Sequence, residues 1–192
     1  MNRDAILDIF REKSALLEGH FKLSSGLHSD TYLQCALVLQ EPATAERLCR
    51  ELATRWEGAA IDVVVGPALG AVVMAHEMAR ALGVRGVFME RREGELTLRR
   101  GFTVSPQETV LVVEDVVTTG GSAAEILRKL EPVGCTVAGV SSLVNRSGSN
   151  PFATRFESLL EITPKTWQPA RCPLCAEGRP LETPGSRQTI GS

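Results

Sequence analysis

The sequence has 192 residues, of which 43% are hydrophobic and 23% charged, and its net charge at neutral pH is −2. These values are typical of one globular domain with a sizeable core, and the net charge gives no case for a general nucleic-acid-binding or membrane-binding surface. No stretch is long and apolar enough to span a bilayer, and acidic residues interrupt the N-terminal segment where a signal peptide needs a continuous apolar run. We therefore expect a cytoplasmic protein.

The first segments of the chain show two different patterns. Residues 3–18 carry apolar side chains at helical spacing, which predicts one or two helices that end at Gly19. The next stretch has short apolar alternations on both sides of a polar turn at residues 24–30, which predicts a hairpin. From its residues alone, we interpret this hairpin as structural.

The middle of the chain alternates between helical and strand patterns. Residues 43–56 have the apolar stripe of an amphipathic helix. The apolar run at residues 61–65 predicts a buried strand, and a glycine-bounded turn at residues 66–71 leads from it into a further helix. That turn could hold an anion, although a tight connection is the simpler interpretation. Residues 85–89 predict another strand, and the charged stretch at residues 90–102 predicts an exposed β-hairpin.

The most informative stretch is residues 110–123. Four apolar residues, 110–113, predict a strand buried on both faces, and two carboxylates, Glu114 and Asp115, follow directly. A turn rich in hydroxyl groups and glycine then leads into a helix. Its free N–H groups and the helix dipole favour a phosphate, while the acids suit vicinal sugar hydroxyls or a hydrated magnesium ion. We interpret the run as a grip on a ribose 5-phosphate. The alternative is an ordinary strand-to-helix turn with solvated acids.

Two more strands follow this motif. Residues 137–144 predict a strand that ends just before Arg146, and residues 157–162 predict the last one. An arginine at the carboxyl end of a parallel strand points to the ligand-binding edge of a sheet, although a surface arginine is the simpler alternative. The alternation of strands and helices supports a doubly wound sheet.

The chain changes in character from Pro164 onward. Half of the ten prolines lie in this last part, so we expect an irregular tail. Within it, Cys172 and Cys175 form a lone Cys-x-x-Cys, which is two ligands short of a structural zinc site. The pair could join cysteines of a second copy, form a disulfide or cap a turn, and a metal held by one chain alone ranks behind these alternatives. The other cysteines sit among apolar neighbours and are expected to be buried, reduced thiols: Cys35, Cys49 and Cys135.

Residues 112–122, Val-Val-Glu-Asp-Val-Val-Thr-Thr-Gly-Gly-Ser, resemble the phosphoribosyl pyrophosphate (PRPP) motif of type I phosphoribosyltransferases. The resemblance implies that the two acids hold the ribose hydroxyls and that the following loop wraps the 5-phosphate. It also implies that Mg²⁺ is bound through PRPP near the acids, without a direct protein metal site. The residues implied in PRPP binding are Glu114, Asp115, Val116, Val117, Thr118, Thr119, Gly120, Gly121 and Ser122, together with Arg91 and Arg92.

A second segment narrows the resemblance to one branch of that family. From residue 21 the chain reads Phe-x-Leu-x-Ser-Gly-x-x-Ser, followed by Tyr32, which is similar to the N-terminal hood of orotate phosphoribosyltransferases. In that family the hood covers the pyrimidine. The implied orotate contacts are Ser25 and Gly26 in the hood, Thr118 in the PRPP motif, and Arg146, which would pair with the carboxylate of the base.

In the same family the stretch at residues 90–102 corresponds to a mobile loop that reaches the neighbouring subunit's site. Arg91 and Arg92 match an Arg-Lys pair of that loop and, with Asp115, are the implied catalytic residues. The loop is shorter here, and the familiar lysine and histidine have no counterpart at residues 88–109. The shared loop implies a twofold homodimer.

These resemblances imply an α/β type I phosphoribosyltransferase fold, with a central parallel sheet flanked by helices and an N-terminal hood. We expect a single domain over residues 1–192, with a hood region at 1–40, an α/β core at 41–163 and the irregular tail at 164–192. The implied activity is transfer of 5-phosphoribosyl from PRPP to orotate in pyrimidine (UMP) biosynthesis, without nucleic-acid or membrane partners. The alternatives are an enzyme for a purine or uracil acceptor, which the hood and Arg146 argue against, and a PRPP-sensing regulator without catalysis.

Overall fold

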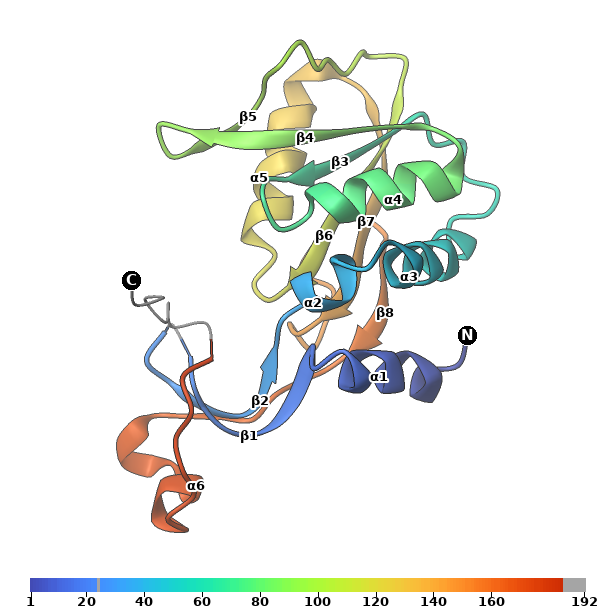
Figure 1. Ribbon diagram of the computed structural model, residues 1–192. Coiled ribbons are helices and arrows are strands. Elements are labelled where there is room, and N and C mark those ends of the chain that lie inside the picture. The colour runs from blue at the N-terminus through green and yellow to red at the C-terminus, as the bar shows by residue number, and fades with distance from the viewer. Residues whose placement is uncertain (24, 185–192) are drawn as a thin grey trace, which may run out of the picture.

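A six-stranded sheet forms the centre of the computed structural model, which describes residues 1–23 and 25–184 (Figure 1). Neighbouring strands are parallel, except that the edge strand β5 runs antiparallel to β4. The α/β class with a central parallel sheet is therefore confirmed. In the order in which they lie side by side, the strands are β5 (Glu95–Leu98), β4 (Arg85–Arg92), β3 (Val63–Pro67), β6 (Thr109–Val117), β7 (Thr136–Asn145) and β8 (Phe156–Glu161).

Helices cover both faces of this sheet. Successive side chains of its central strands point to opposite faces, and those on both faces are apolar and buried. Val64 and Leu111 face a core shared with α1, α3 and α4, whereas Val63 and Val112 face a second core under α5. The apolar runs that predicted buried strands thus fill two cores at once. None of the helices in the described part of the chain is both long and apolar enough to cross a membrane. The helices are α1 (Arg3–Glu12), α2 (Ala36–Leu39), α3 (Pro42–Thr54), α4 (Val72–Leu82) and α5 (Gly121–Leu130).

The prediction of helices over residues 3–18 was wrong beyond Glu12. The chain turns at Ser14, whose φ is +55°, and then enters β1 (Leu16–Lys22), which pairs antiparallel with β2 (His28–Leu33). Gly19 lies inside this strand and ends no helix. Pairing with β2 satisfies the backbone hydrogen-bonding groups of β1. The spacing of apolar side chains along the sequence does not reveal this pairing, so the pattern predicted a helix.

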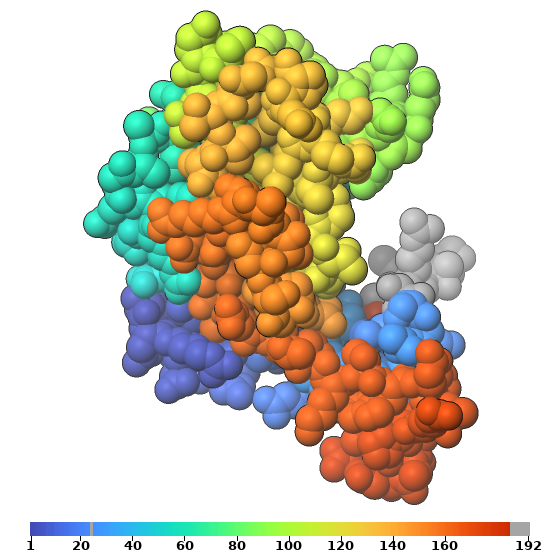
Figure 2. Space-filling model, turned by 180° about the vertical axis from the view of Figure 1, so that it is seen from behind, coloured from blue at the N-terminus to red at the C-terminus, as the bar shows by residue number. Residues whose placement is uncertain are grey.

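The hood is a small three-stranded sheet in the order β1-β2-β9. Its third strand, β9 (Thr166–Trp167), comes from the C-terminal segment, for which the sequence indicated an irregular tail. Two further short elements follow, η2 (Pro169–Arg171) and α6 (Pro173–Ala176). Glu182 then forms a β-bridge with Phe21. The red C-terminal segment and the blue hood strands therefore lie side by side in one lobe (Figures 1 and 2).

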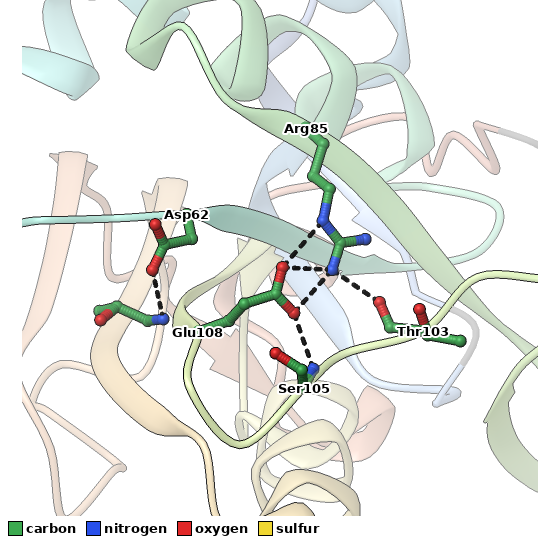
Figure 3. Close-up of polar contacts among 6 residues, drawn as sticks. Asp62, Arg85, Thr103, Ser105 and Glu108 are labelled. Carbon is green, nitrogen blue, oxygen red and sulfur yellow. Dashed lines mark hydrogen bonds and ion pairs between the residues drawn. The ribbon is translucent and has the colours of Figure 1, made fainter.

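A polar network ties together the amino-terminal edge of the large sheet (Figure 3). Arg85, the first residue of β4, donates to Glu108 from Nε at 3.0 Å and from Nη2 at 2.6 Å. The Ser105 N–H donates to Glu108 at 2.7 Å, and the Thr109 N–H donates to Asp62 at 2.8 Å. The side-chain hydrogen bond from Arg85 is the main cause that lowers the pKa of Glu108.

Candidate active site

The two predicted loops meet at the carboxyl ends of the neighbouring strands β3 and β6. The chain leaves β3 through α4 toward β4, and it leaves β6 through α5 toward β7, so the two connections depart in opposite directions. In open α/β sheets, ligands bind at the crevice that such a reversal creates. The local geometry therefore positions the loop at residues 66–71 beside the acids of β6.

Glu114 and Asp115 lie within β6, because this strand continues to Val117 and is longer than the sequence pattern predicted. Successive strand residues point to opposite faces, so the two carboxylates face different neighbours. A Cβ atom placed on Gly70 would lie 3.3 Å from Oδ1 of Asp115, which puts the 66–71 loop directly against that carboxylate. The Ala68–Leu69 peptide bond in this loop is cis.

Burial is the main cause that raises the pKa of both carboxyl groups. For Glu114, hydrogen bonds from the Ser122 hydroxyl and the Ala123 N–H lower the pKa, while the charge of Asp115 raises it further. Glu114 is therefore held by the first turn of α5. For Asp115, backbone N–H groups are the counteracting cause. The site thus brings two acidic side chains together where they are partly shielded from water.

The predicted phosphate loop joins β6 to α5. Thr118 and Thr119 are exposed. The helix α5 begins at Gly121 without a side-chain cap, so the N–H groups of Gly121 and Ser122 have no acceptor within the helix. Gly120 has φ +76°, and a Cβ atom there would come within 2.8 Å of the Phe152 ring. Only glycine fits this position. Such a turn is a receptor for an anion.

Two valines of the predicted PRPP-binding set are part of the core. Val117 is buried and its carbonyl accepts from the Arg146 N–H at 2.7 Å, while Val116 is partly buried against the α3–α4 side. Through their backbone they fix the direction of the loop, and they also couple β6 to the residue that ends β7.

A cavity of about 680 Å³ opens beside this loop, between the hood and the sheet. Arg146, at the carboxyl end of β7, is half-buried in it, and its Nε has no hydrogen-bond partner among the described residues. Burial lowers the pKa of this guanidinium. The cavity is lined by Lys22, Leu23, Ser25, Tyr32, Leu33, Gln34, Thr118, Arg146 and Pro184.

Three of the four predicted orotate-contacting residues line this cavity: Ser25, Thr118 and Arg146. The fourth, Gly26, is the positive-φ residue of the adjacent hood turn, where its N–H donates to the carbonyl of Leu23 at 2.9 Å. Ser24 lies outside the described residues. Because Thr118 follows the acids by only a few residues, the cavity and the phosphate loop form one continuous site.

The arginine pair lies on the β4–β5 hairpin, as the charged pattern predicted. Arg91 Nη1 donates to the Gly94 carbonyl at 2.7 Å and pairs at 3.1 Å with Glu125 of α5 in the same chain. Its charge also lowers the pKa of Glu114. Arg92 is two-thirds exposed and lies 3.6 Å from Glu93. Arg91 is therefore close to the acids of its own chain.

Sequence reasoning missed several residues of the site. Lys22, Tyr32 and Gln34 line the cavity, yet in the sequence they belong to an unremarkable polar hairpin. Tyr32 and Gln34 are two residues apart, and the Tyr32 hydroxyl donates to Gln34 at 3.1 Å. Tyr32 lies near the end of β2 and Gln34 directly after it, and the two-residue spacing was the available signal. The Cys35 thiol donates to the Asp115 carbonyl at 3.7 Å, a contact that no local pattern indicates.

Comparisons with known proteins agree with this geometry. The family described as "Phosphoribosyl transferase domain" matches residues 39–168. An orotate phosphoribosyltransferase of Chlorobium phaeobacteroides is 53% identical over 193 residues, which cover 100% of both chains. Among solved structures, the orotate phosphoribosyltransferase of Aeropyrum pernix has a TM-score of 0.68 at 26% identity, covering 82% of this chain and 93% of its own. That of Mycobacterium tuberculosis, in complex with inorganic phosphate, has a TM-score of 0.63 at 29% identity, covering 83% and 95%.

The fold, the acid pair and the glycine-rich loop define a type I phosphoribosyltransferase. Identity of this extent over the whole length narrows the class: the chain belongs to the orotate phosphoribosyltransferase family.

Proposed function

We propose that this enzyme transfers the 5-phosphoribosyl group of PRPP to N1 of orotate, which gives orotidine 5-monophosphate and pyrophosphate in UMP biosynthesis. One observation carries the proposal. The guanidinium of Arg146, half-buried and without a partner at Nε, lines a cavity that is continuous with the anion-binding loop. A carboxylated planar base fits that guanidinium because carboxylate and guanidinium form paired, charge-assisted hydrogen bonds.

The ribose phosphate would bind where β6 gives way to α5. Glu114 and Asp115 would accept hydrogen bonds from the 2- and 3-hydroxyls, and residues 116–122 would surround the 5-phosphate. The free N–H groups at the start of α5 support this placement. Ser122 donates to Glu114 in this structure, so its hydroxyl would have to turn to donate to a phosphate.

The acid pair fits a magnesium ion that arrives with its substrate. Mg²⁺ prefers one or two carboxylates, with phosphate oxygens and water completing its coordination. Glu114 and Asp115 are two partly buried carboxylates at the ligand edge, and their negative charge favours a magnesium ion held beside them through the oxygens of PRPP, without a direct protein ligand. When bound, the ion would offset the charge of the departing diphosphate. The residues of the chain itself would hold the sugar and the base in position for transfer.

Positioning and charge stabilisation would account for most of the rate enhancement. Transfer passes through a ribosyl centre with oxocarbenium character, so little covalent chemistry falls to the protein. Asp115, against the 66–71 loop, would orient the sugar relative to the leaving diphosphate. Arg91 and Arg92 would bind the diphosphate.

We also propose a cytoplasmic homodimer in which the β4–β5 hairpin reaches the partner's site. Leu69 and Val73 support an interface near the site, because 88% and 44% of their surfaces are exposed beside the 66–71 loop. The contact of Arg91 with Glu125 of its own chain favours instead a hairpin that acts in the site of its own chain, and a mixing experiment distinguishes the two arrangements.

The proposed activity is tested by following the absorbance of orotate after mixing enzyme, PRPP and Mg²⁺. We expect the absorbance to fall, with no consumption of uracil or adenine under the same conditions, and we expect a chelator to stop the reaction. Consumption of adenine or uracil with orotate unchanged would refute the assignment of the acceptor.

A further inference from the structure

Four metal-binding side chains converge in the lobe that joins the hood to the C-terminal segment. They are His20 of β1, His28 of β2, and Cys172 and Cys175 at the two ends of the first turn of α6. One ligand atom from each lies within 4.8 Å of all the others. Among the described residues, this is the one place where three or more histidine, cysteine or acidic side chains gather in this way. The proposed reaction uses none of them.

Four distances between ligand atoms of this cluster are close to those of a tetrahedral site. His20 Nε2 lies 2.9 Å from His28 Nδ1, 3.4 Å from Cys172 Sγ and 3.6 Å from Cys175 Sγ. His28 Nδ1 lies 3.3 Å from Cys175 Sγ. Zinc bonds of about 2.0–2.1 Å to nitrogen and about 2.3 Å to sulfur place tetrahedral ligands ~3.4 Å apart for two nitrogens and ~3.6 Å apart for nitrogen and sulfur. Shifts of up to about half an ångström would bring these four distances to the tetrahedral values, and the two remaining pairs of ligand atoms lie within 4.8 Å of each other.

Hydrogen bonding within the cluster does not account for this convergence. His20 Nδ1 lies 3.0 Å from the carbonyl of Arg179, which can only accept, so in the neutral imidazole Nδ1 carries the proton and Nε2 presents a lone pair. Three polar atoms then crowd around that single lone pair. A cation at their centre would satisfy all four groups at once. A backbone carbonyl behind a histidine is also the usual arrangement around a metal-bound imidazole.

The cluster is enclosed, as structural metal sites are. His20, His28 and Cys172 are 3%, 5% and 4% exposed, and only Cys175 reaches the surface. The surrounding backbone is ordered by pairing: the Glu182 N–H donates to the His20 carbonyl at 2.8 Å. Four protein ligands leave no open position for a substrate.

We propose that His20, His28, Cys172 and Cys175 bind one structural Zn²⁺ ion, which fastens the C-terminal segment to the hood. Two cysteines and two histidines in tetrahedral array select zinc over the hard, oxygen-preferring cations. The ion closes a connection between residues about 150 positions apart in the chain. It lies in the lobe where the red α6 meets the blue strands β1 and β2 (Figure 1).

The connection also bears on the base-binding cavity. Pro184, which follows the metal-binding segment, lines that cavity together with Lys22 and Ser25 of the hood. A fixed C-terminal segment therefore forms part of its wall. The ion would act on orotate binding only through this wall, at a distance from the reacting atoms.

Metal content of the full-length protein, purified without chelators, tests the proposal directly. We expect about one zinc per chain that survives gel filtration, and loss of the metal in the Cys172→Ala/Cys175→Ala double variant and in His20→Gln. Matched controls use the same substitutions elsewhere: Cys135→Ala, in a half-buried position near α5, and His76→Gln, on the exposed face of α4. Both controls should keep the metal.

A second measurement needs no variant, so it holds even if the variants fail to fold. Wild-type protein loaded with Co²⁺ should show the visible bands of tetrahedral cobalt and a thiolate-to-metal charge-transfer band. Removal of the metal should make cleavage by trypsin after Lys165 and Arg171, both exposed, at least about tenfold faster, and added Zn²⁺ should reverse this. Less than about 0.1 zinc per chain after incubation with Zn²⁺, or a mass that shows a Cys172–Cys175 disulfide, would overturn the proposal.

Discussion

Replacing Asp115 by asparagine is the sharpest test of the proposed sugar site. The change exchanges one carboxylate oxygen for an amide group of nearly the same shape. Because the shape is nearly the same, β6 should stay undisturbed, and so should Gly70, where a Cβ atom would lie 3.3 Å from Asp115 Oδ1. What is removed is a charged acceptor for the ribose hydroxyls.

The expected loss of activity follows from the strength of such contacts. A hydrogen bond to a charged group contributes about 1.5–3 kcal/mol. Asparagine keeps one acceptor oxygen but presents donors in place of the other, so we take the loss as about 3–4 kcal/mol. Since each 1.36 kcal/mol is a factor of ten, kcat/KM for PRPP should fall by about 150- to 1000-fold.

The same substitution should not destabilise the protein. Because burial raises the pKa of Asp115, the folded chain holds this proton more tightly than the unfolded chain, whose carboxyl titrates near its ordinary 3.8. The ionised group therefore opposes folding, and this opposition is absent in acid and develops as the pH rises. At neutral pH the melting temperature of Asp115→Asn should equal or exceed that of the wild type, and any advantage should disappear in acid.

The assay is steady-state loss of orotate at varied PRPP, accompanied by thermal melts. Asp62→Asn is a matched control, because Asp62 accepts from the Thr109 N–H at the opposite edge of the same sheet (Figure 3). Its kcat/KM should be unchanged. If Asp115→Asn stays within about twofold of wild-type kcat/KM, the role assigned to this carboxylate is wrong.

Three further outcomes are expected. Arg146→Ala should raise the KM for orotate by about 10- to 100-fold with little change in the KM for PRPP, and unchanged orotate saturation would contradict the contact. If the hairpin acts across a twofold dimer, mixing unfolded Arg91→Ala and Asp115→Asn chains and refolding them together should restore about a quarter of wild-type activity, whereas a hairpin acting within its own chain restores none. Glu108→Gln should lower the free energy of unfolding by about 1 kcal/mol at neutral pH, a modest value because its partner Arg85 is 41% exposed. Because the pKa of Glu108 is lowered from its ordinary 4.5, urea melts should show the difference closing as the pH falls below that value.

Local patterns were enough to predict the sheet and the position of the loop between β6 and α5. The apolar runs of β3 and β6 are confirmed as buried strands, and the hydroxyl- and glycine-rich turn lies between a strand and a helix as expected. Arg146 was predicted at a ligand edge from its position after a strand, and the structure places it at the cavity. Each of these inferences depends on residues that are close together in the sequence.

The predictions that failed or were missing depend on contacts between distant segments. Leu16 and Leu17 extend the apolar pattern of the preceding helix, but pairing with β2 makes them part of a strand. The Cys-x-x-Cys lacked two ligands in the sequence, and the structure supplies His20 and His28 from the far end of the chain. No window of local sequence contains both halves of such a cluster.

The close fit of Gly120 under the Phe152 ring has a consequence for ligand affinity. The Phe152 ring fills the space where a side chain at residue 120 would stand, so this ring fixes the shape of the loop. The loss of conformational entropy from ordering the N–H groups of the loop therefore occurs during folding and not when phosphate binds. Preorganisation of this kind strengthens binding without adding a contact to the ligand. We therefore expect Phe152 to contribute to the affinity for phosphate by holding the loop in its shape.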